Sequence, residues 1–66
     1  MTDWRHRLII EESTLNERIE ALEAFRGTNV YRDLPGTDQD LLTMQLLAMR
    51  SYIYALRARM KRTPPL

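Results

Sequence analysis

The chain has 66 residues, no cysteine and a single histidine, so disulfides are excluded and a structural zinc site is nearly so. A chain below roughly 70–80 residues rarely forms a sufficient core by itself, so oligomerisation is the expected source of its stability. The formal net charge of +1 is too balanced to predict a polyanion partner from composition.

The protein is expected to be soluble and cytoplasmic, with no membrane partner. Its first residues, MTDWRHR, carry an early acid and several cations, which does not fit a secretory signal. The only long apolar segment is interrupted by Gln45, Arg50, Arg57 and Arg59, well before the ~20 apolar residues that a membrane span needs. The absence of cysteine also fits a reducing compartment.

The first predicted helix covers about residues 2–26. Thr2 or Asp3 can cap its first amides, and Gly27 provides a stop at its end. Its apolar residues keep a heptad-like face that is suited to packing along another helix. These residues are Trp4, Leu8, Leu15, Ile19 and Leu22.

Residues 27–36 form the predicted connection. Val30 and Leu34 are spaced as neighbours on one helical turn, so a short helical turn is expected to plug the end of the helix pair. A second candidate binding site lies here, because polar and aromatic residues on short loops often carry recognition. Its members are Asn29, Tyr31 and Arg32; the alternative is that they support the loop backbone and cover neighbouring residues.

The second predicted helix covers about residues 37–62, and residues 63–66 are expected to form a flexible tail because two prolines cannot continue it. One apolar row runs along it with 4-3-4-3-4 spacing, which predicts the seam of an antiparallel helical hairpin. The row is Leu42, Leu46, Met49, Ile53, Leu56 and Met60. The fold class is therefore all-α, with residues 1–62 as one domain.

The second helix is apolar on more than one side. Of the 16 residues from 41 to 56, 12 are apolar when Ala and Tyr are counted. A helix of this kind has to be covered on several sides, and one partner helix cannot do that. We therefore expect a helical homo-oligomer, whose interface includes Leu41, Met44, Leu47 and Tyr52.

Antiparallel pairing of the two apolar rows predicts a basic open end. It places Leu8 opposite Leu56 and Trp4 opposite Met60, so that Arg5 to Arg7 meet the cations from Arg57 to Arg62. Cations near the start of a helix interact unfavourably with the helix dipole, so an anionic partner is expected to stabilise them. That partner is Glu11 or Glu12, an acid of a neighbouring subunit, or an anionic ligand.

An anionic ligand of nucleotide type would suit this end of the hairpin. Guanidinium groups bind phosphate bidentately, and an aromatic ring can stack on a base. Trp4 has simple packing as its alternative role. The candidate ligand-binding residues are Trp4, Arg5, His6, Arg7, Tyr54, Arg57, Arg59 and Lys61.

The sequence contains no assembly of residues for catalysis. His6 stands alone among cations, and neither a Gly-rich phosphate loop nor a Cys/His ligand spacing occurs. The protein is therefore not expected to be an enzyme or to hold a metal or cofactor. Specific DNA binding is not expected either, although the basic end could bind nucleic acid without sequence preference.

The segments DWRHRLIIEESTLNERIEALEAF and LPGTDQDLLTMQLLAMRSYIYALRARM resemble a group of short accessory proteins encoded by tailed bacteriophages. The shared pattern includes an early Trp and the spacing of Leu41, Leu42, Gln45, Met49 and Tyr52. By architecture, the hairpin is also similar to phage sponge proteins that sequester nucleotide immune signals. This resemblance implies a non-enzymatic anti-defence protein of the host cytoplasm that binds a cyclic nucleotide or ADP-ribose-type signal.

Two alternatives remain open beside the sponge hypothesis. The exposed face of the second helix could bind a host defence or regulatory protein as an inhibitor or adaptor, in the manner of a helix that fills a groove. A structural component of the virion is the third possibility.

Overall fold

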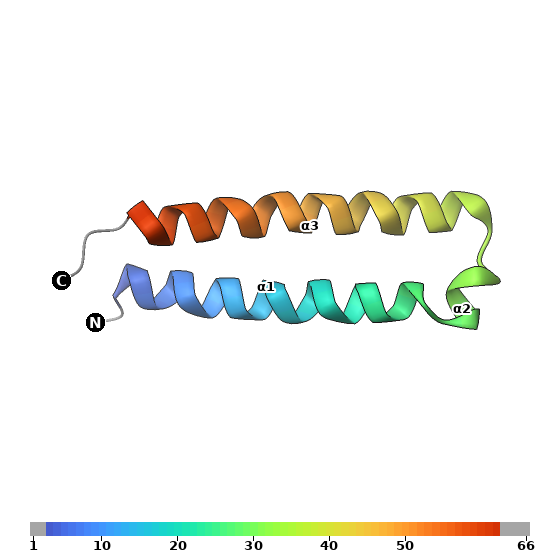
Figure 1. The fold of residues 1–66 in the computed structure, drawn as a ribbon, viewed down its shortest axis with the longest axis horizontal. Coiled ribbons are helices and arrows are strands. Elements are labelled where there is room, and N and C mark those ends of the chain that lie inside the picture. The colour runs from blue at the N-terminus through green and yellow to red at the C-terminus, as the bar shows by residue number, and fades with distance from the viewer. Residues whose placement is uncertain (1–2, 63–66) are drawn as a thin grey trace.

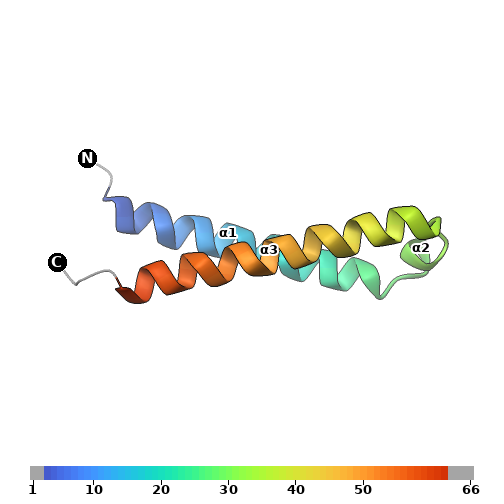
Figure 2. The ribbon, with the colours of Figure 1, turned by 90° about the horizontal axis from the view of Figure 1, so that it is seen from above.

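The computed structural model describes residues 3–62 and contains two long helices and one short one. They are α1 (Trp4–Arg26), α2 (Asn29–Arg32) and α3 (Gly36–Arg62). The long helices lie side by side and run in opposite directions, with α2 at the turn (Figures 1 and 2). The all-α prediction is confirmed, and the predicted tail at 63–66 lies outside the described residues.

Short polar side chains start the first two helices. The Asp3 carboxylate accepts the backbone N–H of Arg5 at 3.1 Å, and the Thr28 hydroxyl accepts that of Tyr31 at 3.2 Å. The third helix begins at Gly36, one residue before the predicted start, because the Pro35 carbonyl already accepts the N–H of Gln39 at 3.1 Å. The connection therefore spans residues 27–35 rather than 27–36.

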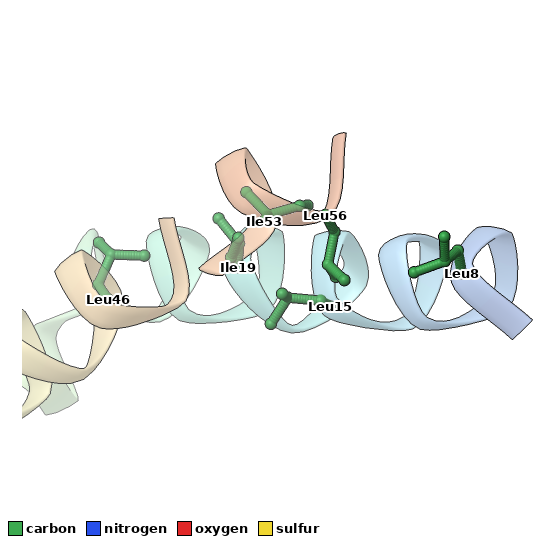
Figure 3. Close-up of a cluster of buried hydrophobic side chains, with 6 residues drawn as sticks. All are labelled: Leu8, Leu15, Ile19, Leu46, Ile53 and Leu56. Atoms are coloured by element: carbon green, nitrogen blue, oxygen red, sulfur yellow. The ribbon is translucent and has the colours of Figure 1, made fainter. Parts of the chain in front are cut away.

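The core is a single apolar seam between α1 and α3. Figure 3 shows six buried side chains that point toward one another across the two helices. Leu46 has no exposed surface, and Leu22, Met49 and Met60 pack against the cluster. The predicted seam is confirmed for its buried members, which are Leu8, Leu15, Ile19, Leu46, Ile53 and Leu56.

Two predictions about the ends of the seam are wrong. Trp4 was expected inside it, opposite Met60, but its surface is 48% exposed. Val30 was expected to plug the turn end and is 63% exposed. Trp4 lies in the first turn of α1 and Val30 on the short helix α2, and neither side chain is enclosed between the two long helices.

Two ion pairs show that the register of the helices differs from the prediction. Arg57 contacts Glu12 at 3.1 Å, whereas the apolar rows placed it opposite Arg7. Arg50 contacts Glu23 at 3.2 Å. Glu12 lies five residues and Glu23 nine residues farther along α1 than predicted, which is about one and a half and two and a half helical turns at 3.6 residues per turn.

The short helix α2 explains this displacement. It folds beside the first turns of α3, where the Tyr31 hydroxyl lies 3.4 Å from both the Gln39 carbonyl and the Thr43 hydroxyl. These contacts place α2 beside Gln39 and Thr43 in the first turns of α3. The pairing of the two long helices therefore begins farther along α3 than it would if a tight loop joined them.

Candidate ligand-binding site

Three shallow hollows surround the open end, where α1 begins and α3 ends. Side chains of both helices line each of them, and every predicted ligand-binding residue lines one. The predicted set is divided among the three hollows instead of forming one cluster. Trp4, Arg7 and Arg59 line the first, Arg5 and His6 the second, and Tyr54, Arg57 and Lys61 the third.

The first hollow, which we name the Trp4 hollow, combines an aromatic ring with two guanidinium groups. Trp4 and Arg7 come from the first two turns of α1, and Arg59 from the last turns of α3. Buried Leu8 and the carboxylate of Glu11 complete its lining. A ring for stacking, two forked cations and one hydrogen-bond acceptor form a set that matches a small phosphorylated nucleoside.

The second hollow is less cationic than the sequence indicates. Arg5 and His6 line it with Ile9 and Met60, but Asp3 lies at its edge. The Nε atom of Arg5 is 3.6 Å from Asp3 Oδ2. The Arg5 charge is therefore partly neutralised by Asp3, the residue that caps the start of α1.

The third hollow contains Tyr54 and Lys61, but its arginine is held within the helix pair. The Nε and Nη2 atoms of Arg57 donate to Glu12 Oε1 at 3.2 and 3.1 Å, and Nη2 also donates to Asn16 Oδ1 at 3.2 Å. The prediction that Arg57 joins the cations of Arg5 to Arg7 is therefore wrong, because the register of the helices places Arg57 beside the acid Glu12. Tyr54 is 76% exposed, more than any other large apolar or aromatic side chain of the described residues.

The second candidate site lies at the opposite end of the molecule, where two of its side chains support the turn. The Tyr31 ring packs edge-on against Phe25 with centroids 6.0 Å apart, and the Arg26 guanidinium lies 5.9 Å from the Tyr31 centroid. Arg32 Nη2 donates to the Gly27 carbonyl at 3.4 Å. The hydrogen bond with Thr43, and then Arg26, lower the pKa of the Tyr31 phenol.

Asn29 is the third member of this site and opens α2. Its carbonyl accepts the backbone N–H of Asp33 at 3.0 Å, which closes the single turn of that helix. These contacts agree with the structural alternative for the connection, in which its polar residues stabilise the loop.

Gln39 is central to the connection and was missed by sequence reasoning. Its Nε2 donates to the carbonyls of Tyr31, Arg32 and Leu34 at 3.1, 3.2 and 3.0 Å. The carbonyls of Tyr31 and Arg32 lie at the end of α2 and that of Leu34 in the turn that follows, where backbone groups lack the regular hydrogen bonds of a helix interior; the Tyr31 carbonyl also accepts the backbone N–H of Leu34 at 3.1 Å. A glutamine in the first turns of a helix gives no pattern in the sequence from which this contact could be predicted.

Replacing Gln39 by Ala is expected to lower the free energy of unfolding by about 1–2 kcal/mol, because three carbonyls lose their shared donor. Denaturant unfolding followed by circular dichroism measures this. Gln45→Ala removes the same amide from an exposed position of α3, and surface changes of this kind stay within about 0.5 kcal/mol. Equal effects of the two substitutions would contradict the assigned role of Gln39.

The predicted oligomer interface lies on the exposed side of α3. Leu41, Met44, Leu47 and Tyr52 are all exposed, at 57, 64, 55 and 48%. They lie away from the seam that faces α1, so this surface is open to a partner. Several large apolar side chains exposed on one helix are typical of an interaction site.

The described residues offer no obvious metal site and no membrane span. Within residues 3–62, no three His, Cys, Asp or Glu side chains gather closely enough to hold a metal ion. No helix in this part of the chain is long and apolar enough to cross a bilayer.

The fold and the open end define a small all-α protein with shallow hollows at the end where α1 begins and α3 ends. A family model supports this class. The Sequestin family model matches residues 2–62, and the chain therefore belongs to the Sequestin family. The family name indicates a sequestering role, which is one of binding. No curated protein and no solved structure matches the chain.

Proposed function

We propose that this protein is a phage-encoded homo-oligomer that binds and sequesters a small anionic nucleotide-type immune signal in the host cytoplasm. The observation that carries the proposal is the Trp4 hollow, which holds an aromatic ring and two guanidinium groups at one opening. Membership of the Sequestin family supports the sequestering part. The ligand class is a cyclic nucleotide or an ADP-ribose derivative.

The proposed contacts follow from the chemistry of the three side chains. Trp4 is half-exposed and would stack on the base, while Arg7 and Arg59 bind the phosphate oxygens in a forked geometry. Glu11 can accept a hydrogen bond from an exocyclic amine or a ribose hydroxyl. The Trp4 hollow is shallow and open to solvent. We propose that a second subunit covers its open side and so encloses the ligand.

The other predicted ligand-binding residues have less direct roles in this proposal. Lys61 and Tyr54 line the third hollow and are available to a ligand or to a neighbouring subunit. His6 and Arg5 line the second hollow, next to Asp3. Arg57 contributes by holding Glu12, which fixes the relative position of the two helices at this end.

Titration calorimetry with a panel of cyclic dinucleotides, cyclic trinucleotides and ADP-ribose derivatives tests the ligand class. One class is expected to bind at micromolar concentration or tighter and to raise Tm, since a ligand at 100 times its Kd adds about 2.7 kcal/mol to stability. Mass spectrometry of the ligand released by denaturation should show it unchanged, as sequestration requires. Absence of heat and of a thermal shift across the whole panel would overturn the proposal.

The alternative is an inhibitor or adaptor that covers a host protein with the outer face of α3. The exposed Leu41, Met44, Leu47 and Tyr52 favour it, because an apolar helix face is a common recognition element. Affinity purification from host lysate with wild type and Tyr52→Ala distinguishes the two. A stoichiometric host protein that is lost with Tyr52→Ala, together with no binding in the nucleotide panel, would favour the alternative.

A further inference from the structure

The outer face of α3 is built to pack against a second copy of itself in antiparallel orientation, and we propose that this contact forms the basic dimer of the protein. The inference rests on the self-association part of the proposed function and not on the ligand. The face consists of two rows with heptad spacing, Leu41, Ala48 and Ala55 in one and Met44, Ser51 and Ala58 in the other.

These six residues lie opposite the seam that packs on α1. Five of them are exposed and Ala58 is half-buried, whereas Leu46, Ile53 and Leu56 on the inner face are buried. Their combined spacing is 3-4-3-4-3, which is the pattern of a helix that packs along another helix. The helix therefore carries two such faces, of which the hairpin covers one.

Side-chain size along this face points to an antiparallel partner. The large residues Leu41 and Met44 lie in the first half, and the small residues Ala55 and Ala58 lie in the second. When two copies run in opposite directions, Leu41 meets Ala58 and Met44 meets Ala55 of the second copy. A large residue then faces a small one in these two pairs, which fills the space between the helices evenly. In a parallel pair, Met44 would face Met44 and the facing alanines would leave a gap.

The charges beside this face agree with the same orientation. Asp40, Leu47, Tyr54 and Lys61 follow one another at intervals of seven residues and therefore form one edge of the face. In antiparallel helix pairs, like edges meet, so Asp40 lies against Lys61 of the second copy and Leu47 against its Tyr54. All four side chains are exposed. In a parallel pair this edge would face the opposite edge of the partner helix, where Gln45 rather than a cation lies beside Asp40.

Engineered thiols test the orientation directly, because the chain contains no cysteine. Met44 and Ala55 lie ~17 Å apart along α3, which exceeds the reach of a disulfide. An equimolar mixture of Met44→Cys and Ala55→Cys is expected to give a disulfide-linked heterodimer under mild oxidation, while each variant alone stays uncrosslinked. A mixture of Met44→Cys with Glu17→Cys, whose cysteine lies on α1, provides the background.

The outcomes separate the dimer from the rest of the proposal. Crosslinking of Met44→Cys with itself, or a mixture that gives no more product than the Glu17→Cys background, would overturn the antiparallel contact. Circular dichroism establishes that each variant remains helical. Nucleotide titration of the wild-type chain tests ligand binding independently. The antiparallel contact can therefore be disproved while ligand binding is confirmed, and ligand binding can be disproved while the contact is confirmed.

Charge reversal provides a second test that needs no thiol. Asp40→Lys or Lys61→Asp alone is expected to raise the dimer Kd about tenfold, because each dimer contains two such contacts. The double variant should return it to near the wild-type value. Residues 40 and 61 of one helix are ~31 Å apart, so restoration can come only from contact between copies. A double variant that dimerises as weakly as the single ones would contradict the register.

Discussion

Replacing Leu46 by Ala is expected to destabilise the protein by about 2–5 kcal/mol, the largest effect of any single substitution considered for this chain. Leu46 has no exposed surface and belongs to the buried seam between α1 and α3 (Figure 3). A chain of 66 residues has a total stability of roughly 3–10 kcal/mol. Loss of this side chain therefore removes a large part of the stability, and Tm should fall by roughly 10–20 °C.

The control for this substitution is Ile10→Ala, which truncates an aliphatic side chain that is about half-exposed on α1. Its effect is expected to stay near or below about 1 kcal/mol, since less apolar surface leaves the protein interior. Both variants are compared with wild type at one protein concentration, because the proposed self-association would make Tm depend on concentration. Similar losses for Leu46→Ala and Ile10→Ala would show that the seam in Figure 3 is not the core.

The faces of the helices were predictable from the sequence, while their axial register was not. The spacing of Leu46, Ile53 and Leu56 is a local property of one helix, and these residues are buried as predicted. Register depends on side chains that meet from distant parts of the chain, such as Arg57 with Glu12. Heptad spacing repeats every seven residues, so a displaced pairing satisfies it almost as well.

The composition of the open end followed from the sequence, but its subdivision did not. Trp4, Arg7 and Arg59 come to one hollow because α1 begins where α3 ends, which the antiparallel prediction already contains. Their separation from Tyr54 and Lys61 follows from the angular positions of these residues around their helices. Glu11 and Glu12 line two of the hollows, so the two acids that the sequence offered as partners for the cations also shape the candidate sites.

The acids at the open end change the expected chemistry of the ligand. A site of cations alone would favour any polyphosphate, and its affinity would decrease steeply with salt. In the Trp4 hollow, Glu11 repels excess negative charge and accepts hydrogen bonds. A ligand with few phosphates and exposed donor groups, such as a cyclic nucleotide, fits this combination better than a linear triphosphate.

Trp4→Ala and Arg7→Ala are each expected to lower the affinity for the nucleotide ligand by at least tenfold. A stacked base contributes about 1–3 kcal/mol, and a charge-assisted hydrogen bond about 1.5–3 kcal/mol. Both side chains are exposed, so Tm without ligand should change little. Calorimetric titration of the bound nucleotide from the panel measures the affinity of each variant.

Conservative and matched variants separate stacking and phosphate binding from general charge. Trp4→Phe retains a ring and should lose less affinity than Trp4→Ala, while Arg7→Lys retains the charge but loses the forked geometry and should give an intermediate loss. Arg18→Ala removes an exposed arginine from the same helix, outside the three hollows, and should bind like wild type. If Arg7→Ala and Arg18→Ala bind the nucleotide equally well, the ligand does not occupy the Trp4 hollow.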